Sequence, residues 1–599
     1  MELIRVTLLY FLACAVHVAG NNVIRLEPST SPPPNTSSVV DPSFAGFGIE
    51  ASNLFSFTGA AQPNGFTLNL LNNLANYTGK PSHIRIGGNT QDYMTFREDH
   101  NDWTWIENPN ADHPGASDSM IIGPRFFETA NRLPKGTTVT WGLNLAYEQD
   151  DYIQQITTMA KQAISGLSNL NITSFEIGNE PDLYLKNGLR TGEWGGKVYT
   201  AQWLERASAI YKQVLQPASI PSAFFEAAAT ASTIGTDFQI INLIGFDIFP
   251  RDGSAATPYL SGWNQHDYYY YIGVSGYPVT LEHLMKLQTT EEQFVAWAQQ
   301  VKQAQQTPYP YSLREMGVVG PIGLDGVTDV FGAALWTLNF LCYMASLGVS
   351  SVGFHMTDNS NASAWQPIPM YGQPAHVRPL YYGVAAFDQV IGCSSAVRIA
   401  QLQTAQVPPE YVDFVRAYAV YQEEQLASVV VVNGKIANIS EAQKTSATVQ
   451  LQLPSSSAGQ AVYLSYLTNS GADATVNTTW DGFSFEQNGD GIPVRISNEE
   501  HTVRVGSDGT ASFSVRDSEA VVASIGGKVG CVEPIVASFP ESPSTTSGVD
   551  SPAPSATSSS GANRTSNSND ESGAAAPITT VFACLLPWGP GLIAGFLML

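Results

Sequence analysis

Short apolar or alternating stretches recur along the first two thirds of the chain, and each is followed by a segment long enough for a helix. Apolar residues are spaced as in a helix in several of these following segments, for example in 282–306 and 331–347. The predicted strands cover residues 44–53, 83–88, 138–145, 172–177, 224–232, 261–271, 309–317 and 350–358. Strands that alternate with helices favour a parallel sheet, and eight such units predict an α/β fold, a (β/α)8 TIM barrel with elaborated loops.

The pattern changes after residue 379. From Ala396 to Ile525 short alternating runs are separated by polar turns, and no long stretch has a helical period. This part of the chain therefore predicts a C-terminal antiparallel β-sandwich domain. We expect the catalytic barrel to span residues 44–379 and the β domain residues 380–530, while the lead at 21–43 could add one strand to the β domain.

Both ends of the chain have features of an exported protein. Residues 1–20 form a short apolar run that ends in small residues, as in a secretory signal peptide. Residues 531–576 are rich in Ser, Thr and Pro and predict a flexible stalk, and residues 577–599 form an apolar tail typical of a glycosylphosphatidylinositol (GPI) attachment signal. A C-terminal membrane helix is the alternative, disfavoured by Pro587 and Pro590. We expect a secreted, cell-surface protein held by a GPI anchor at the plasma membrane or cell wall.

The charge balance excludes several classes of partner. The chain has 52 acidic and 28 basic residues, a formal net charge of -24. Such a surface repels nucleic acid and long polyanions. We find no Cys/His spacing typical of a metal site and no glycine-rich nucleotide motif. The sequence therefore predicts no nucleic-acid partner, no metal and no organic cofactor.

Cysteines and glycosylation sequons agree with an oxidising compartment. Cys342 lies in an apolar helical run and is interpreted as a buried free thiol, which leaves Cys393 and Cys531 as the predicted disulfide. Asn-X-Ser/Thr sequons, which also occur by chance, are found at Asn35, Asn76, Asn171, Asn361, Asn438, Asn477 and Asn563.

Two carboxylates stand at similar places in this pattern. The strand at 172–177 leads into Asn179-Glu180-Pro181, and the strand at 309–317 presents Glu315 before a glycine-containing loop. In a TIM barrel the C-terminal ends of the strands carry the chemistry. Glycoside hydrolysis needs two carboxyl groups, one to protonate the leaving oxygen and one to act on the anomeric carbon. A solvated glutamate in a turn is the competing reading for either motif alone.

These motifs together resemble a known family. Asn-Glu-Pro after the fourth strand, a glutamate on the seventh, Arg-Ile-Gly-Gly-Asn at 85–89, His-X-Tyr at 266–268 and a C-terminal β domain are similar to glycoside hydrolase family 79, the fungal and bacterial β-glucuronidases and their relatives. The resemblance covers roughly residues 40–530. It implies a retaining mechanism in which Glu180 is the general acid/base and Glu315 the nucleophile.

The resemblance also assigns substrate contacts around the pair. Asn179 would hold the substrate 2-hydroxyl, with a turn-capping role as the alternative, and Glu50 would bind distal sugar hydroxyls. Arg85 is expected behind the nucleophile, or as a salt-bridged strut. Tyr268 would donate a hydrogen bond to Glu315 and His266 would line the pocket, unless the tyrosines of this strand only fill the barrel mouth.

Recognition of the sugar carboxylate is assigned to backbone N-H groups. Gly317, Gly320 and Gly323 in the loop after Glu315 are the predicted nest, although the turn itself requires glycine. Trp336, Trp365 and Tyr371 near the eighth strand could stack on sugar rings, with core packing as an equal alternative.

The sequence thus predicts a retaining exo-β-glycosidase that removes terminal glucuronic or 4-O-methylglucuronic acid from glycans. The acidic surface disfavours an endo-enzyme that grips a polysulfated chain. One alternative is a related enzyme acting on a neutral sugar such as glucose or xylose. The other is an inactive cell-surface carbohydrate-binding protein, which has no need of both carboxylates.

Overall fold

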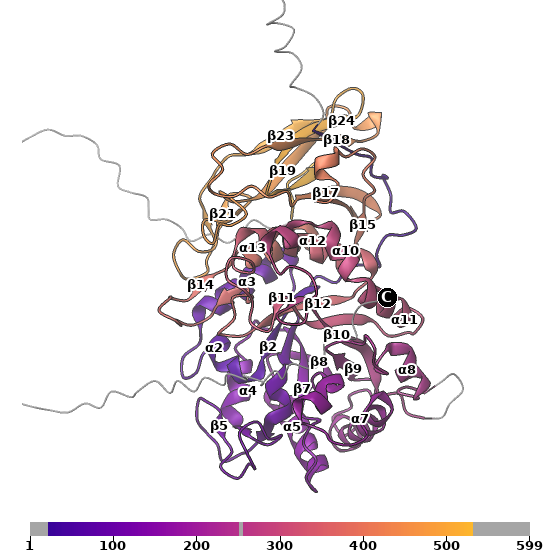
Figure 1. Ribbon diagram of the computed structural model, residues 1–599, viewed down its shortest axis with the longest axis vertical. Coiled ribbons are helices and arrows are strands. Elements are labelled where there is room, and N and C mark those ends of the chain that lie inside the picture. Colours follow the sequence, from indigo (N-terminus) through magenta and orange to yellow (C-terminus); the bar gives the residue numbers. More distant parts are fainter. Residues whose placement is uncertain (1–21, 251–255, 531–599) are drawn as a thin grey trace, which may run out of the picture. The chain divides into compact units, whose positions relative to one another are not determined.

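Eight parallel strands close into a barrel in the computed structural model, which describes residues 22–250 and 256–530 (Figure 1). In order around the barrel they are β2 Ala45–Glu50, β3 Ile84–Gly87, β7 Thr138–Leu143, β8 Asn171–Ile177, β9 Phe225–Thr230, β10 Leu260–Tyr271, β11 Tyr311–Gly320 and β12 Ser351–Met356. Each of them overlaps one of the strands predicted from the sequence. The TIM-barrel prediction is confirmed.

Helices follow the strands and cover the barrel from outside. The longer ones are α3 Gly65–Thr78, α5 Tyr152–Gly166, α7 Gly196–Ile210, α11 Val295–Ala304, α12 Phe331–Leu347 and α13 Pro379–Ile391. The shorter ones are α2 Leu54–Thr58, α4 Pro124–Ala130, α6 Tyr184–Asn187, α8 Ile240–Gly245, α9 Leu281–Met285 and α10 Gln288–Gln293. Helix α5 buries Ile156, Met159, Ala160 and Ala163, one face of a 3.6-residue period. Helix α3 begins where the Asn64 side chain accepts from the Thr67 N-H.

Two small sheets lie in the loops that follow the C-terminal ends of the barrel strands. Strands β4 Met94–Phe96, β5 Ile106–Glu107 and β6 Met120–Ile122 form one sheet within the long connection between β3 and β7. Strands β13 Trp365–Gln366 and β14 His376–Val377 form a hairpin after β12. These insertions follow the C-terminal ends of barrel strands, the face that carries active sites in TIM barrels.

The C-terminal domain consists of two sheets packed on one apolar core. The larger sheet contains β15 Val397–Gln401, β16 Val415–Gln422, β17 Gln425–Asn433, β19 Ala461–Thr468, β20 Thr479–Trp480, β21 Phe483–Ser484, β22 Val494–Arg495, β23 His501–Arg504 and β25 Glu519–Ile525. The smaller sheet contains β18 Ser446–Gln452, β24 Thr510–Arg516 and the N-terminal strand β1 Val23–Leu26. Strand β1 pairs with β18 in parallel, while the other strand pairs of both sheets are antiparallel. Residues of both sheets, such as Val431 and Val449, share the core.

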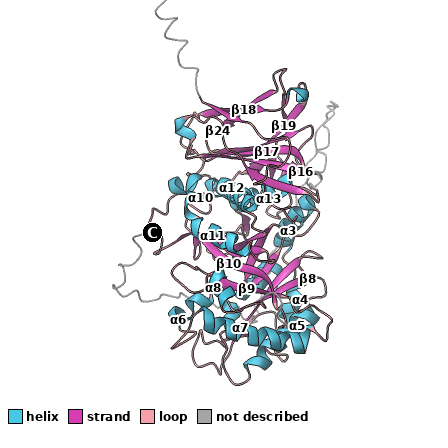
Figure 2. Cartoon of the chain, turned by 90° about the vertical axis from the view of Figure 1, so that its right-hand side faces the viewer, coloured by secondary structure: helices cyan, strands magenta, loops and turns pink. Residues whose placement is uncertain are grey.

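The boundary between the domains lies later than the sequence predicts. Helix α13 starts at Pro379 and belongs to the barrel, because the Tyr381 hydroxyl donates to the Leu70 carbonyl of α3 at 2.8 Å. In both views α12 and α13 lie between the barrel strands and the β domain (Figure 2). Trp480 of the β domain donates from Nε1 to Gln389 Oε1 of α13 at 2.5 Å. The β domain therefore begins near β15, after the last barrel helix.

Several predicted features lie outside the described residues: the signal peptide at 1–20, the stalk at 531–576, the tail at 577–599, Cys531 and Asn563. The disulfide of Cys393 with Cys531 therefore stays a prediction, while Cys342 is buried and free. Of the described sequons, Asn35, Asn171, Asn361 and Asn477 are exposed, and Asn76 and Asn438 are half-buried. Within 22–250 and 256–530, no helix is long and apolar enough to cross a membrane.

Candidate active site

Glu180 lies three residues after the end of β8, in a backbone turn that buried side chains hold in place. Gly178 has φ +86° and Glu180 itself has φ +49°, so both residues adopt left-handed conformations before Pro181. The buried carboxylate of Asp92 accepts from the Asn179 N-H at 2.8 Å and from the Tyr184 hydroxyl at 2.6 Å. Burial raises the pKa of Asp92 to about 6. The turn that presents Glu180 is therefore pinned by a residue that the sequence analysis did not single out.

Glu315 lies within its strand rather than at its end. Strand β11 continues to Gly320, which corrects the predicted loop after Glu315. Along the pairing of β10 with β11, Gln265 faces Leu313 and the next residue, His266, faces Glu315, so Arg314 is skipped in a β-bulge. Bulges re-aim side chains and are common beside active sites.

The bulge turns two consecutive side chains into the barrel. Arg314 donates from Nε and Nη2 to the carboxylate of Glu226 at 2.9 and 2.7 Å, while Glu315 faces the catalytic end. Strict alternation along the strand would place Arg314 on the outer face, and the bulge is the reason that its side chain points inward. Ser174 also donates to Glu226, at 2.9 Å, so Arg314 belongs to a buried ion pair beneath the site.

Glu180 and Glu315 face each other across the barrel mouth. Together with a ring nitrogen of His266, one carboxylate oxygen of each lies within 4.8 Å of the others. Their side chains are 13% and 7% exposed. Retaining glycosidases separate the two carboxyl groups by about 5–5.5 Å, and inverting enzymes by about 6.5–9.5 Å. The close approach is that of a retaining pair.

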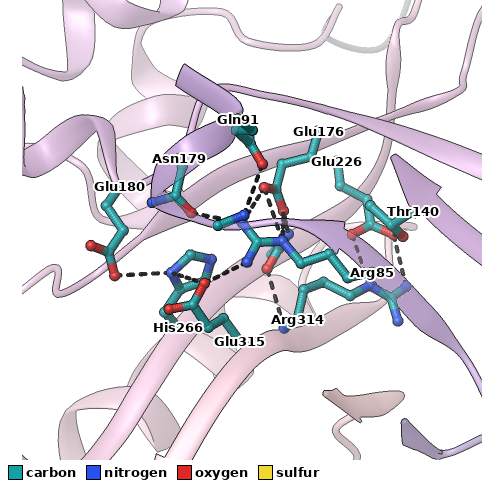
Figure 3. A network of polar contacts seen from close by, with 12 residues as sticks. Arg85, Gln91, Thr140, Glu176, Asn179, Glu180, Glu226, His266, Arg314 and Glu315 are labelled. Carbon is teal, nitrogen blue, oxygen red and sulfur yellow. Dashed lines mark hydrogen bonds and ion pairs between the residues drawn. The ribbon is translucent and has the colours of Figure 1, made fainter. Parts of the chain in front are cut away.

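Arg85 connects the nucleophile side of the site to the barrel interior (Figure 3). Its Nη1 donates to Glu315 Oε2 at 2.5 Å, its Nη2 to Asn179 Oδ1 at 2.7 Å and its Nε to Glu176 Oε1 at 3.1 Å. Nη2 also donates to Glu176, and Asn264 donates to the same carboxylate from the other side. Glu176 and Arg85 are 0% and 1% exposed, so the fork of the guanidinium fixes both Glu315 and Asn179 from within.

Strand β10 supplies one partner to each catalytic carboxylate. The Tyr268 hydroxyl donates to Glu315 Oε1 at 2.7 Å, as the sequence analysis expected. His266 Nδ1 lies 3.0 Å from Glu180 Oε1, in a hydrogen bond whose donor depends on the tautomer. Burial lowers the pKa of His266 to about 4, so this imidazole is neutral near neutral pH. The ring is fully buried, which places it beneath Glu180 and not on the pocket wall.

The environment separates the pKa values of the two carboxyl groups. Burial, and then the charge of Glu315, raises the pKa of Glu180 to about 8. Burial acts on Glu315 in the same direction, but His355, Arg85 and the Tyr268 hydroxyl outweigh it and hold the pKa of Glu315 well below its ordinary value. Glu180 is thus protonated and Glu315 ionised across the neutral range, the division of roles that an acid and a nucleophile require.

Two carboxylates and an imidazole, the side chains of Glu180, Glu315 and His266, are also the groups that bind cations in proteins. Glu180, His266 and Glu315 each offer one ligand atom within 4.8 Å of the others. The guanidinium of Arg85 already contacts Glu315 and supplies positive charge at this place. A protonated Glu180 also lacks the charge of a ligand carboxylate, and these two facts favour acid/base chemistry over metal binding at this cluster.

Glu50 and Asn179 are both held by backbone and side-chain partners. Glu50 accepts from the N-H groups of Ala51, Asn89 and Thr90 and from the Thr90 hydroxyl, so it ties the loop after β3 to β2. Asn179 Nδ2 donates to Asn89 Oδ1 at 3.0 Å. Asn179 therefore orients neighbouring side chains and does not cap its own turn.

The first part of the predicted glycine loop after Glu315 is a strand. Gly317 and Gly320 are strand residues paired with Tyr268 and Tyr271 of β10. A Cβ at either position would come within 2.7 or 2.6 Å of those tyrosine rings, so glycine is required for close packing. Gly323 has φ +82°, but its N-H donates to the Val319 carbonyl. Gly317 and Gly320 therefore belong to the strand and not to the predicted loop.

The three aromatic residues of the predicted stacking surface lie in two kinds of environment, two of them buried and one exposed. Trp365 is fully buried between Phe47, Phe57 and Tyr381, and its Nε1 donates to Thr67. Its assignment to substrate stacking is therefore wrong. Trp336 is likewise fully buried, in α12. Tyr371 is 80% exposed between β13 and β14, without a described contact to either catalytic carboxylate.

Three residues of the site were missed from the sequence: Asp92, Glu176 and His355. His355 Nδ1 lies 3.6 Å from Glu315 Oε2. Two of them could have been found from the sequence. Glu176 and His355 occupy positions that face the barrel interior in the period-two alternation of their strands. Polar residues there either pair with one another or face the active site.

Comparisons with known proteins agree with this geometry. Residues 417–522 match the model described as the glycosyl hydrolase family 79 C-terminal beta domain. A β-glucuronidase from Aspergillus niger is 29% identical over 524 residues, which cover 83% of this chain and 93% of the relative. A β-glucuronidase from Neurospora crassa is 26% identical over 527 residues, 80% of this chain and 91% of the relative.

Solved structures share the fold. A 4-O-α-L-rhamnosyl-β-D-glucuronidase from Fusarium oxysporum has a TM-score of 0.67 at 20% identity and covers 84% of this chain and 100% of its own. A family 51 arabinofuranosidase from Xanthomonas axonopodis pv. citri has a TM-score of 0.54 at 14% identity, covering 84% and 99%. The chain is thus similar to glycoside hydrolase family 79 in its C-terminal domain and to two β-glucuronidases over most of its length, and it shares the fold of these solved structures.

Proposed function

We propose that the protein is a retaining exo-β-glucuronidase that removes terminal β-linked glucuronic or 4-O-methylglucuronic acid from glycans. The observation that carries the proposal is the pair Glu180 and Glu315, whose oxygens approach within 4.8 Å and whose pKa values are shifted in opposite directions. The two curated relatives over most of the chain, both β-glucuronidases, support the uronic acid as the sugar that is released.

The geometry supports a double displacement. Glu315, ionised and held by Arg85 and Tyr268, attacks the anomeric carbon while the bond to the leaving oxygen breaks and Glu180 delivers its proton to that oxygen. Water then attacks the glycosyl ester, Glu180 takes the proton from the water, and the Glu315 carboxylate is released. Neutralisation of Glu315 in the ester removes the charge that raises the pKa of Glu180, so Glu180 stays ionised after it has given up its proton and can accept a proton from water in the second step.

The test is hydrolysis of 4-nitrophenyl β-D-glucuronide beside the matching glucoside and xyloside, by the full-length wild type and by Glu180→Gln and Glu315→Gln. We expect selective release from the glucuronide, loss in Glu315→Gln and a strong decrease in Glu180→Gln. Proton NMR during the reaction should show the β-anomer of glucuronic acid first, because retention follows from two inversions.

Each contrary result has its own meaning. Turnover of a neutral glycoside alone would keep the mechanism and replace the sugar. Silence on all three substrates would favour a carbohydrate-binding protein. First appearance of the α-anomer would reject the retaining mechanism.

We also propose that the protein is secreted and anchored at the cell surface through GPI. The support is the sequence at its two ends, the apolar run at 1–20 and the tail at 577–599 after small residues. Treatment of intact expressing cells with phosphatidylinositol-specific phospholipase C should release the activity into the medium. Activity that stays with the cells after this treatment, and is released only by detergent, would contradict the anchor.

A further inference from the structure

The barrel interior holds a second buried ion pair, Arg314 with Glu226, that the mechanism does not use (Figure 3). Nε and Nη2 of Arg314 donate to the Glu226 carboxylate at 2.9 and 2.7 Å. Nη1 is buried without a partner, so Glu226 is the only hydrogen-bond acceptor of this guanidinium within residues 22–250 and 256–530. Arg314 directly precedes the nucleophile Glu315 in the chain, so whatever fixes its position also acts on the nucleophile.

Arg314 is the bulged residue of β11. No residue of β10 pairs with it, and on the other side of the strand Arg314 and Glu315 together oppose Gly353 of β12. In a regular strand two consecutive side chains face opposite sides of the sheet, whereas the bulge lets both of these face the barrel interior. The direction of Glu315 therefore depends on the bulge.

Three other strands accommodate the backbone of the bulge. The Arg314 N-H donates to Asn264 Oδ1 of β10 at 3.3 Å. A Cβ at Gly48 of β2 or at Gly353 of β12 would come within 2.8 or 2.6 Å of the Arg314 carbonyl oxygen, so both positions require glycine. The neighbouring strands thus leave room for the bulged backbone, and Glu226 holds the side chain.

Glu226 is itself tied to the strand that leads to Glu180. It lies on β9 and accepts from the Ser174 hydroxyl of β8 at 2.9 Å. Strands β8 and β11 are not adjacent in the barrel, because β9 and β10 lie between them. The contacts from Ser174 through Glu226 to Arg314 therefore link the strand before the acid with the strand that carries the nucleophile.

Resting on the proposed function, we infer that Glu226 is a positioning residue, which holds the bulge at Arg314 and thereby aims the Glu315 carboxylate at the anomeric carbon. Arg85 and Tyr268 fix the rotation of this carboxylate. The ion pair of Glu226 fixes the backbone from which the carboxylate projects. A misplacement of about 1 Å, caused by a mutation far from the chemistry, can slow a reaction on the order of 100-fold.

The test measures the attack by Glu315 separately from the acid step. The probe is 2,4-dinitrophenyl 2-deoxy-2-fluoro-β-D-glucuronide, whose phenolate leaves without protonation. A Glu315 oxygen forms a bond to the anomeric carbon while the bond from that carbon to the phenolate oxygen breaks, and the phenolate departs with the electron pair. The fluorine slows hydrolysis of the ester, so the adduct on Glu315 accumulates and is measured by mass spectrometry.

Two variants remove the ion pair in different ways. Glu226→Gln keeps the shape of the side chain without its charge, and the double variant Glu226→Gln with Arg314→Met leaves no buried charge unpaired. We expect the rate constant of labelling to fall roughly tenfold or more in both. The affinity for D-glucuronic acid, measured by calorimetry, should stay close to that of the wild type. Because Glu226 acts through Arg314, Glu226→Gln should have no further effect in the Arg314→Met background.

Asp517→Asn is the matched control for the loss of a buried ion pair. Asp517 lies in the β domain, where its carboxylate is buried and contacts Lys435 at 3.2 Å. This variant should lose stability and keep the wild-type rate of labelling. Thermal unfolding shows which variants are folded, and either Glu226 variant is sufficient for the test.

The outcomes separate this inference from the proposed function. Labelling at the wild-type rate in a folded Glu226 variant would overturn the inference, and so would an equal loss of labelling and of affinity for glucuronic acid. A wild type that reacts with the matching fluoroglucoside and not with the fluoroglucuronide would reject the proposed sugar, and the variants are then compared on the fluoroglucoside. A wild type that forms no adduct with either probe would reject the double displacement itself.

Discussion

The hydroxyl of Tyr268 donates to Glu315 Oε1 at 2.7 Å, while Arg85 holds the other oxygen, Oε2, at 2.5 Å. Each oxygen of the nucleophile thus has its own donor, one from β10 and one from β3. The carboxylate cannot rotate without losing both bonds, which fixes the direction of its attack.

Replacement of Tyr268 by phenylalanine should slow the enzyme without unfolding it. A hydrogen bond to a charged group contributes about 1.5–3 kcal/mol, which corresponds to roughly a 10- to 100-fold lower kcat/KM. The pKa of Glu315 should rise, so the acid limb of the pH profile moves to higher pH. Tyr269→Phe, whose hydroxyl contacts Thr289 and not the site, is the control. Equal rates for the two variants would contradict this role of Tyr268.

The basic limb of the pH profile should report Glu180. The acid must be protonated to act, and burial with the charge of Glu315 raises its pKa to about 8. We therefore expect kcat/KM to be constant through neutral pH and to fall above about pH 8. In Glu315→Gln the neighbouring charge is gone, so the pKa of Glu180 should decrease. Carbon-13 NMR of labelled glutamate in this inactive variant measures the change, and a pKa that stayed constant would refute the electrostatic coupling.

Loss of the Arg85 charge should cost both stability and activity. Arg85→Met leaves Glu176 and Glu315 buried without their cation, a change that destabilises by about 3–5 kcal/mol. The double variant Arg85→Met with Glu176→Gln should regain part of this stability, because one buried charge is neutralised, but not the activity. Chemical denaturation and turnover measure the two effects. If Arg85→Met alone is as stable as the wild type, the pair is not the strut described above.

Substitutions of the buried Trp365 and the exposed Tyr371 should differ in their effect on stability. Trp365→Ala removes a fully buried indole and should destabilise by about 3–5 kcal/mol. KM in the folded variant should be unchanged, because the ring has no face toward the site. Tyr371→Ala, at an 80% exposed position, should leave the melting temperature within experimental error. A higher KM for Trp365→Ala would restore the stacking role.

The barrel and its two carboxylates could be predicted because their signals are local. Period-two alternation marks the strands, and the chemistry of glycoside hydrolysis selects Glu180 and Glu315 from them. The side chain of Arg314 could not be placed, because its direction depends on a bulge that exists only in the pairing of β10 with β11. The sequence alone does not give the register in which two distant strands pair.

Packing between distant segments explains most other differences. Trp365 and Tyr371 are six positions apart, and only contacts with Phe47 and Phe57 decide that the first is core. Gly317 and Gly320 suggest a loop by composition, yet they are strand residues because they pair with Tyr268 and Tyr271 of β10. His355 carried an inward alternation signal without a motif around it, so its nearness to Glu315 became visible only in the folded barrel.

Strand β1, Val23–Leu26, is synthesised long before the strand with which it pairs. Its partner β18 ends at Gln452, and at about 5–20 residues per second a ribosome needs roughly 20–80 s to add the residues between them. Throughout that interval the growing chain can assemble its barrel, while the first strand stays without its neighbour. The pairing of β1 with β18 therefore has to wait until residues 446–452 have been synthesised.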